Sequence, residues 1–154
     1  MLYNDKVNQA LRLCYEMHKG QLDKSDVPYV FHPFMVANML REPATTNEII
    51  TALLHDIFED CPNPFENEMF AKVYDTLDDE VKIALDLLTH YKCYSYDEYI
   101  SRIAENKIAT KVKCADLGHN MMLSRLDQLT QKDTDRYMKY RKALSYLRDN
   151  GTWS

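Results

Sequence analysis

The spacing of apolar residues is the feature of this sequence that most limits its fold. Apolar side chains recur every three or four residues, as on one face of an α-helix, and not at every second residue as in a strand. Only three glycines and five prolines occur in 154 residues, which leaves little material for the tight turns of β-hairpins. We see no internal repeat, low-complexity tract or linker. The sequence therefore predicts a single all-α domain over residues 1–154, a bundle of about seven or eight helices.

Capping residues mark where several of these helices begin. Thr45 with Glu48 and Ser95 with Glu98 match the capping box, in which two side chains bond each other's backbone N–H groups. The first box is expected to open a helix that runs through Phe58. Other helices are expected at about 7–20, at 33–41 with a proline in the first turn, from 78 or 79 to 88, at 107–122, and at 137–147. Residues 61–64 are expected to form a loop, and whether 65–76 is one helix stays open.

Composition and charge exclude several classes of protein. The chain is 45% hydrophobic and 28% charged, which is typical of a soluble globular domain. It has no apolar run of about 20 residues and no signal-peptide pattern at its start, so we expect a cytoplasmic protein without a membrane partner. A net charge of −5 disfavours a nucleic acid polymer as partner, but is compatible with a small anionic ligand. The four cysteines form no C-x-x-C pair, so we expect reduced thiols in or near the core.

The first cluster of chemically active side chains lies in the segment 53–60, Leu-Leu-His-Asp-Ile-Phe-Glu-Asp. In a helix, His55 and Glu59 would share one face, and Asp56 and Asp60 would share the neighbouring stripe. Imidazole and carboxylate groups together suit a divalent cation such as Mn²⁺, Fe²⁺ or Zn²⁺. A His-Asp pair taken alone is weak evidence, because a histidine beside an aspartate on a protein surface is common.

Two further segments strengthen the interpretation. Residues 28–33 read Pro-Tyr-Val-Phe-His-Pro and place His32 at a junction between loop and helix, stiffened by the proline that follows. Residues 112–120 read Val-Lys-Cys-Ala-Asp-Leu-Gly-His-Asn and place Asp116 and Asn120 one helical turn apart on one face.

Together these segments resemble the RelA/SpoT-type alarmone hydrolase domains and their small stand-alone relatives, within the HD superfamily of metal-dependent phosphohydrolases. The segment 28–33 is similar to that family's P-Y-x-x-H-P, and residues 52–60 match its A-L-L-H-D-x-x-E-D. The segment 115–120 is similar to A-D-R-L-H-N, and His-Lys-Gly-Gln at 18–21 looks like part of its A-H-x-G-Q. The resemblance covers most of the chain and implies a helical HD-domain bundle.

The resemblance also implies an activity and a set of site residues. The implied reaction is removal of the 3′-diphosphate from guanosine 3′,5′-bis(diphosphate), in which a water activated by one divalent ion attacks phosphorus. That ion would usually be Mn²⁺, with Fe²⁺ or Zn²⁺ as alternatives, and its implied ligands are His32, His55, Asp56 and Asp116. Glu59 and Asp60 would orient the water or move protons. The implied substrate contacts are Lys24, Asn120, Lys19 and Tyr137, and Lys111 and Lys113 are further candidates for phosphate. Core packing is the simpler explanation for Tyr137.

The chain departs from the family at two places that bear on the substrate. Asp23 stands where the family has an arginine that packs on the nucleotide base, and a carboxylate there reverses the sign of the charge. Leu117 and Gly118 replace the arginine and leucine of A-D-R-L-H-N. His119 is expected to support or pack against the site and not to be a fifth ligand.

Two alternative functions therefore stay open, and the sequence leaves the oligomeric state undetermined. One is a phosphohydrolase for another nucleotide, such as a nucleoside 5′-monophosphate or a nicotinamide dinucleotide phosphate. The other is a metal- or nucleotide-binding regulatory domain without turnover. The presence of both Glu59 and Asp60 argues for an enzyme, because a sensor needs the metal but not both of these carboxylates.

Overall fold

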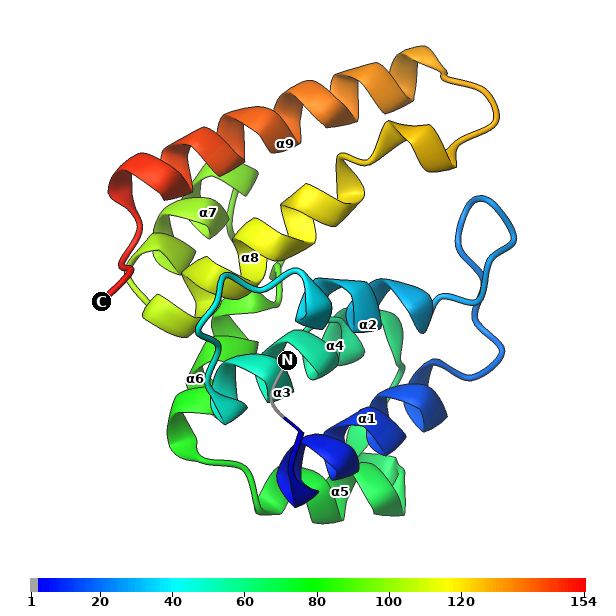
Figure 1. Ribbon diagram of the computed structural model, residues 1–154, viewed down its shortest axis with the longest axis vertical. Helices are drawn as coiled ribbons and strands as arrows, with labels where there is room; N and C mark the ends of the chain where they lie inside the picture. The colour runs from blue at the N-terminus through cyan, green and yellow to red at the C-terminus, as the bar shows by residue number, and fades with distance from the viewer. Residues whose placement is uncertain (1–2) are drawn as a thin grey trace.

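The computed structural model describes residues 3–154, apart from the side chain of residue 125. The described residues form helices joined by loops, and their β-type pairing is limited to one isolated antiparallel bridge between Leu22 and Pro28 (Figure 1). This confirms the all-α fold class. The α-helices are α1 (Asp5–His18), α2 (Phe31–Asn38), α3 (Thr46–Leu54), α4 (Ile57–Asp60), α5 (Glu68–Asp75), α6 (Asp79–Leu88), α7 (Tyr96–Ala104), α8 (Lys107–Asn120) and α9 (Gln131–Asn150), with the 3₁₀-helices η1 (Pro64–Glu66) and η2 (Leu123–Arg125).

Helix α3 is the centre of the bundle. It packs against α1, α2, α6 and α8, and residues 48–54 of this helix are all buried. From Ile49 to Leu54 every residue except Thr51 is apolar, and a helix segment that is apolar around most of its surface is stable only inside a protein. Helix α9 lies along the outside, where it packs on α7 and α8 (Figure 1). The end of α3 lies beside α2 and α8, which also contribute polar side chains there.

Local capping explains most of the helix starts. Both predicted capping boxes are confirmed, at the starts of α3 and α7. A third box, Thr130 with Asp133, starts α9. Asn67 caps α5 by accepting a hydrogen bond from the backbone of Phe70, and this separates α5 from η1. Residues 65–76 therefore form two short helices.

The helix expected from Thr45 through Phe58 is wrong in its second half. It ends at Leu54, and α4 begins at Ile57 after a turn at His55 and Asp56. The reason is a side chain that competes with the backbone: His55 Nδ1 lies 2.7 Å from the Ala52 carbonyl oxygen. In a continuous helix this carbonyl would accept from the backbone N–H of Asp56.

Two smaller expectations also need correction. Helix α2 ends at Asn38 and not near residue 41. Cys14 and Cys61 are buried and Cys114 is half-buried, but Cys93 is exposed and does not belong to the core. Within the part of the chain that the structure describes, no helix has the length and apolar character needed to cross a membrane.

Candidate metal centre

Three buried side chains, from α2, from α8 and from the end of α3, lie close together. His32 comes from the first turn of α2, His55 follows the end of α3, and Asp116 lies on α8. Asp116 Oδ1 lies 3.0 Å from His32 Nε2 and 3.6 Å from His55 Nε2. One potential ligand atom from each residue lies within 4.8 Å of the other two, so the three could hold a metal ion.

Asp56 completes this group. Its Oδ2 atom lies 3.1 Å from His55 Nε2 and 3.4 Å from His32 Nε2. The Tyr29 hydroxyl donates a hydrogen bond to the same oxygen over 2.6 Å. The structure thus brings together all four residues that the resemblance implied as metal ligands, and we call them the four-residue cluster.

The hydrogen bonds behind the imidazoles point their other nitrogens into the cluster. The 2.7 Å contact of His55 Nδ1 with the Ala52 carbonyl requires the proton on Nδ1, which leaves a lone pair on Nε2 in the neutral ring. His55 Nε2 is buried and has no hydrogen-bond partner in the described part of the chain. His32 Nδ1 lies 2.7 Å from His119 Nδ1, and the two rings stack. A buried nitrogen without a hydrogen bond, facing two carboxylates, fits a metal ligand.

Polar neighbours keep both carboxylates ionised. Asp116 accepts hydrogen bonds from Lys113 Nζ and Asn120 Nδ2, each over 2.8 Å. Burial raises the pKa of Asp116, but Lys113 and the two histidines outweigh it and hold the pKa well below its usual range. Burial likewise raises the pKa of Asp56, yet His55 brings it down to about 2. The cluster therefore holds two negative charges in a buried place.

The same charges act on His55. Burial lowers the pKa of this imidazole, but Asp56 and Asp116 outweigh burial and raise the pKa well above its usual range. The protein thus attracts positive charge to this point. A divalent cation on two imidazole nitrogens and two carboxylate oxygens would supply that charge, so the donor set fits Mn²⁺, Fe²⁺ or Zn²⁺.

Glu59 and Asp60 lie on the rim of the cluster, on α4. Burial is the main cause that raises the pKa of both carboxyl groups above their usual values. Glu59 Oε1 accepts a hydrogen bond from the backbone N–H of His90 over 2.6 Å, which fixes this carboxylate. His90 therefore positions a predicted catalytic group through its backbone.

A cavity of about 440 Å³ opens onto the cluster. Of the predicted substrate contacts, Lys24, Asn120 and Tyr137 line it, whereas Lys19 does not. Lys111 also lies elsewhere, in an ion pair of 2.8 Å with Glu48. Helix α9 contributes residues that the sequence did not single out, namely Asp133, Arg136 and Tyr140.

Asp23, which lines the same cavity, has a structural role in its loop. Its Oδ1 atom accepts from the backbone N–H groups of Ser25, over 2.7 Å, and Val27, over 3.0 Å. These two bonds close the turn at residues 23–27, in which Asp26 has a φ of 60°. One oxygen of the carboxylate that stands in place of the family's arginine is therefore engaged by backbone donors.

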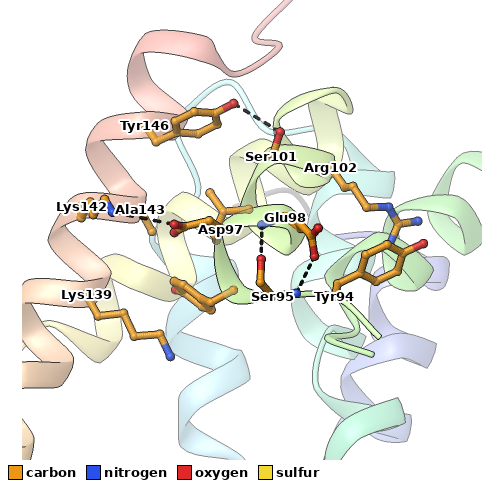
Figure 2. Close-up of a pocket in the computed structure, with 12 residues that line it drawn as sticks. Tyr94, Ser95, Asp97, Glu98, Ser101, Arg102, Lys139, Lys142, Ala143 and Tyr146 are labelled. Atoms are coloured by element: carbon orange, nitrogen blue, oxygen red, sulfur yellow. Dashed lines mark hydrogen bonds and ion pairs between the residues drawn. The ribbon is translucent and has the colours of Figure 1, made fainter. Parts of the chain in front are cut away.

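A larger cavity, about 1020 Å³, lies between α7 and α9 and includes none of the cluster residues (Figure 2). Its charged groups contact near neighbours: Lys142 Nζ lies 3.8 Å from Asp97 Oδ2, and Arg102 lies over the Tyr94 ring. Size alone therefore does not single out the cavity that opens onto the cluster.

Comparisons with known proteins agree with this geometry. The bifunctional (p)ppGpp synthase/hydrolase SpoT of Escherichia coli is 30% identical over 124 residues, which cover 75% of this chain and 18% of SpoT. A guanosine-3′,5′-bis(diphosphate) 3′-pyrophosphohydrolase of Haemophilus influenzae is 29% identical over 113 residues, 69% of this chain and 17% of the relative. The chain thus spans less than a fifth of the length of these curated relatives. No family model matches it.

A solved structure supports the same assignment of fold. A metazoan orthologue of SpoT, described as hydrolysing ppGpp, matches with a TM-score of 0.72 at 23% identity, over 99% of this chain and 90% of that one. This chain belongs to the RelA/SpoT branch of the HD superfamily. In this HD domain the His-Asp pair of the motif at residues 52–60 is His55-Asp56, at the break between α3 and α4.

Sequence reasoning missed several groups that shape the site of this HD domain. Tyr29 was part of a quoted motif, but its bond to Asp56 depends on how the loop before α2 packs. Lys113 was treated as a candidate for phosphate, whereas its ammonium group binds Asp116. Nothing in the sequence indicated a role for Arg136 in the site, apart from its place on the last helix.

Proposed function

We propose that this HD domain is a divalent-metal-dependent pyrophosphohydrolase that converts guanosine 3′,5′-bis(diphosphate) and water into GDP and pyrophosphate. The observation that carries this proposal is the four-residue cluster, in which His55 Nε2 is buried without a hydrogen bond beside two ionised carboxylates. The names of the relatives supply the substrate class.

His32, His55, Asp56 and Asp116 would hold one ion, for which we propose Mn²⁺. Two imidazoles and two carboxylates are four ligands, fewer than the six that an octahedral ion accepts. When bound, such an ion acts as a Lewis acid that makes water easier to deprotonate and offsets charge on a phosphate oxygen. His119 and Tyr29 would keep His32 and Asp56 in the orientation that binding needs.

Glu59 is the proposed proton acceptor. Its pKa is raised by burial, which makes the carboxylate a stronger base than an exposed glutamate. It takes a proton from the attacking water while the water oxygen bonds to the phosphorus attached to the 3′-oxygen. The bond between that phosphorus and the 3′-oxygen breaks, and the 3′-oxygen takes up the proton that Glu59 accepted from the water, relayed by Asp60. The products are the free 3′-hydroxyl of GDP and pyrophosphate.

The cavity beside the cluster has groups that suit a guanine nucleotide. Lys24 and Arg136 are the cations on its wall that would bind diphosphate oxygens. Tyr137 and Tyr140 offer rings for the base, and the amide of Asn120 lies next to Asp116. Arg136 would supply the guanidinium that Asp23 does not.

The test compares turnover and metal binding in matched variants. Purified chain with Mn²⁺ is expected to release pyrophosphate and GDP from guanosine 3′,5′-bis(diphosphate). Glu59→Gln is expected to keep its metal and lose activity by about 100-fold or more, the scale of general-base catalysis. Glu66→Gln is the control, because Glu66 is exposed on η1 and does not line the cavity.

Three results would contradict the proposal in different ways. Full activity of Glu59→Gln would show that Glu59 is not the proton acceptor. The assigned substrate would be wrong if the chain hydrolysed a nucleoside 5′-monophosphate or a nicotinamide dinucleotide phosphate in preference to guanosine 3′,5′-bis(diphosphate). Metal binding without turnover of any of these nucleotides would indicate a regulatory domain.

A further inference from the structure

Gly118 lies inside α8 at a position where the backbone does not require glycine. It has ordinary helical geometry, and a Cβ atom built there would meet only Met39 Cε, at 3.4 Å. Glycine inside a helix costs about 1 kcal/mol relative to alanine. The family motif has leucine at this position, so the substitution removes a whole side chain. Glycine therefore leaves room here that is bordered by the Met39 side chain.

That space belongs to a second cavity, on another face of α8. The cavity that opens onto the cluster is lined by residues 113, 116 and 120 of the helix. The second cavity, of about 660 Å³, lies against residues 111, 114, 115 and 118. The other walls are formed by Met39 and Arg41, after α2, by Leu144 and Arg148 of α9, and by Trp153, beyond the end of α9. The two cavities share no lining residue in the described part of the chain.

The second cavity is positively charged although the chain as a whole is negative. Arg41, Lys111 and Arg148 line it, and no acidic residue does so among those the structure describes. Lys111 is neutralised by Glu48, at 2.8 Å. Neither arginine has a carboxylate within 4.0 Å in the described residues, so two guanidinium groups keep an uncompensated charge.

An aromatic surface lies beside these cations. Trp153 is half-buried, and the Arg41 guanidinium lies 5.7 Å from the centre of its ring. Burial raises the pKa of the Cys114 thiol to about 11. Arg148 lies close enough to this thiol to lower its pKa and so to oppose burial in part. Both arginines therefore face the cavity and not only the solvent.

We propose that this cavity is a second ligand site, which binds a mononucleotide with its base against Trp153 and its phosphate on Arg41 and Arg148. The volume lies within the range of small-molecule sites, about 300–1,000 Å³. Guanidinium groups bind phosphate through paired hydrogen bonds, and an indole ring stacks on a planar base. Gly118 supplies the room, and the site is separate from the proposed catalytic cavity.

Trp153 gives a direct readout, because it is the only tryptophan in the sequence. The full chain, stripped of metal, is titrated with GMP while the tryptophan fluorescence is recorded. A saturable change is expected with GMP, and guanosine or inorganic phosphate alone should bind at least about tenfold more weakly, since each keeps only half of the contacts. No saturable change with GMP at millimolar concentration would overturn the proposal, and equal binding of phosphate alone would reduce the site to an anion site.

Variants separate this site from the catalytic one. Gly118→Leu is expected to fill the cavity and abolish the fluorescence change, and its fold is checked by circular dichroism. Arg148→Gln should weaken GMP at least about tenfold, while Arg141→Gln, an exposed arginine on the same helix, should not. His55→Ala should leave the change intact. Equal titrations of the two arginine variants, or loss of the change in His55→Ala, would contradict the assignment.

Discussion

Removing the Tyr29 hydroxyl is expected to weaken metal binding without disturbing the fold. The hydroxyl donates to Asp56 Oδ2 over 2.6 Å, and the same oxygen lies 3.1 Å from His55 Nε2. Tyr29→Phe keeps the ring, which packs against His18 and His32, and deletes only the donor. The Asp56 carboxylate then loses the group that fixes its orientation toward the cluster.

Two independent estimates of the effect agree. A hydrogen bond to a charged group contributes about 1.5–3 kcal/mol. Since about 1.4 kcal/mol corresponds to a factor of ten in affinity, this predicts that the Kd for Mn²⁺ rises by about 10-fold to 100-fold. Partners that orient metal ligands in known sites have effects of about 10–100-fold when they are removed.

The assay is calorimetric titration of the metal-stripped chain with Mn²⁺. Tyr91→Phe is the matched control, because the Tyr91 hydroxyl donates to Asp86 Oδ1 over the same 2.6 Å on an exposed part of the surface. The control should bind Mn²⁺ like the unmodified chain. Unchanged affinity in Tyr29→Phe, or an equal loss in Tyr91→Phe, would refute the reasoning.

Three further predictions concern stability. Lys113→Met breaks the buried 2.8 Å ion pair with Asp116 and should lower the free energy of unfolding in urea by about 3 kcal/mol or more. Lys72→Met breaks an exposed ion pair and should lower that free energy by under about 0.5 kcal/mol. Similar losses in the two variants would show that burial does not matter here. Ser95→Ala removes one half of the α7 capping box and should cost about 1 kcal/mol by the same assay while turnover stays unchanged, and a loss of turnover would tie α7 to the site. Mn²⁺ at 100 times its Kd should stabilise the stripped chain by about 2.7 kcal/mol, seen as a higher melting temperature; an equal rise in His55→Ala would place the metal elsewhere.

The features that could be predicted from sequence are those set by residues close together in the chain. The capping boxes at Thr45 and Ser95 involve groups three residues apart, so the local pattern determines them. The four cluster residues were named because three separate motifs occur in the right order. Their meeting in space follows from the packing of α2, α3 and α8, which the resemblance implied and the apolar pattern alone would not reveal.

The features that were missed depend on contacts between distant segments or on side chains that compete with the backbone. The break at His55 arises because its ring bonds the Ala52 carbonyl, and a helical pattern contains no sign of this. The bond from Tyr29 to Asp56 spans 27 residues, and the contact between His32 and His119 spans 87. The part of Asp23 in closing its loop depends on two backbone donors that no pattern in the sequence indicates.

The most direct test of the account measures metal content and pyrophosphate release on the same samples. The unmodified chain loaded with Mn²⁺ should hold one equivalent of the ion and hydrolyse guanosine 3′,5′-bis(diphosphate), and both properties should disappear together in His55→Ala and in Asp116→Asn. Hydrolysis by chain that has been stripped of all divalent metal, or a full equivalent of Mn²⁺ in both variants, would contradict it.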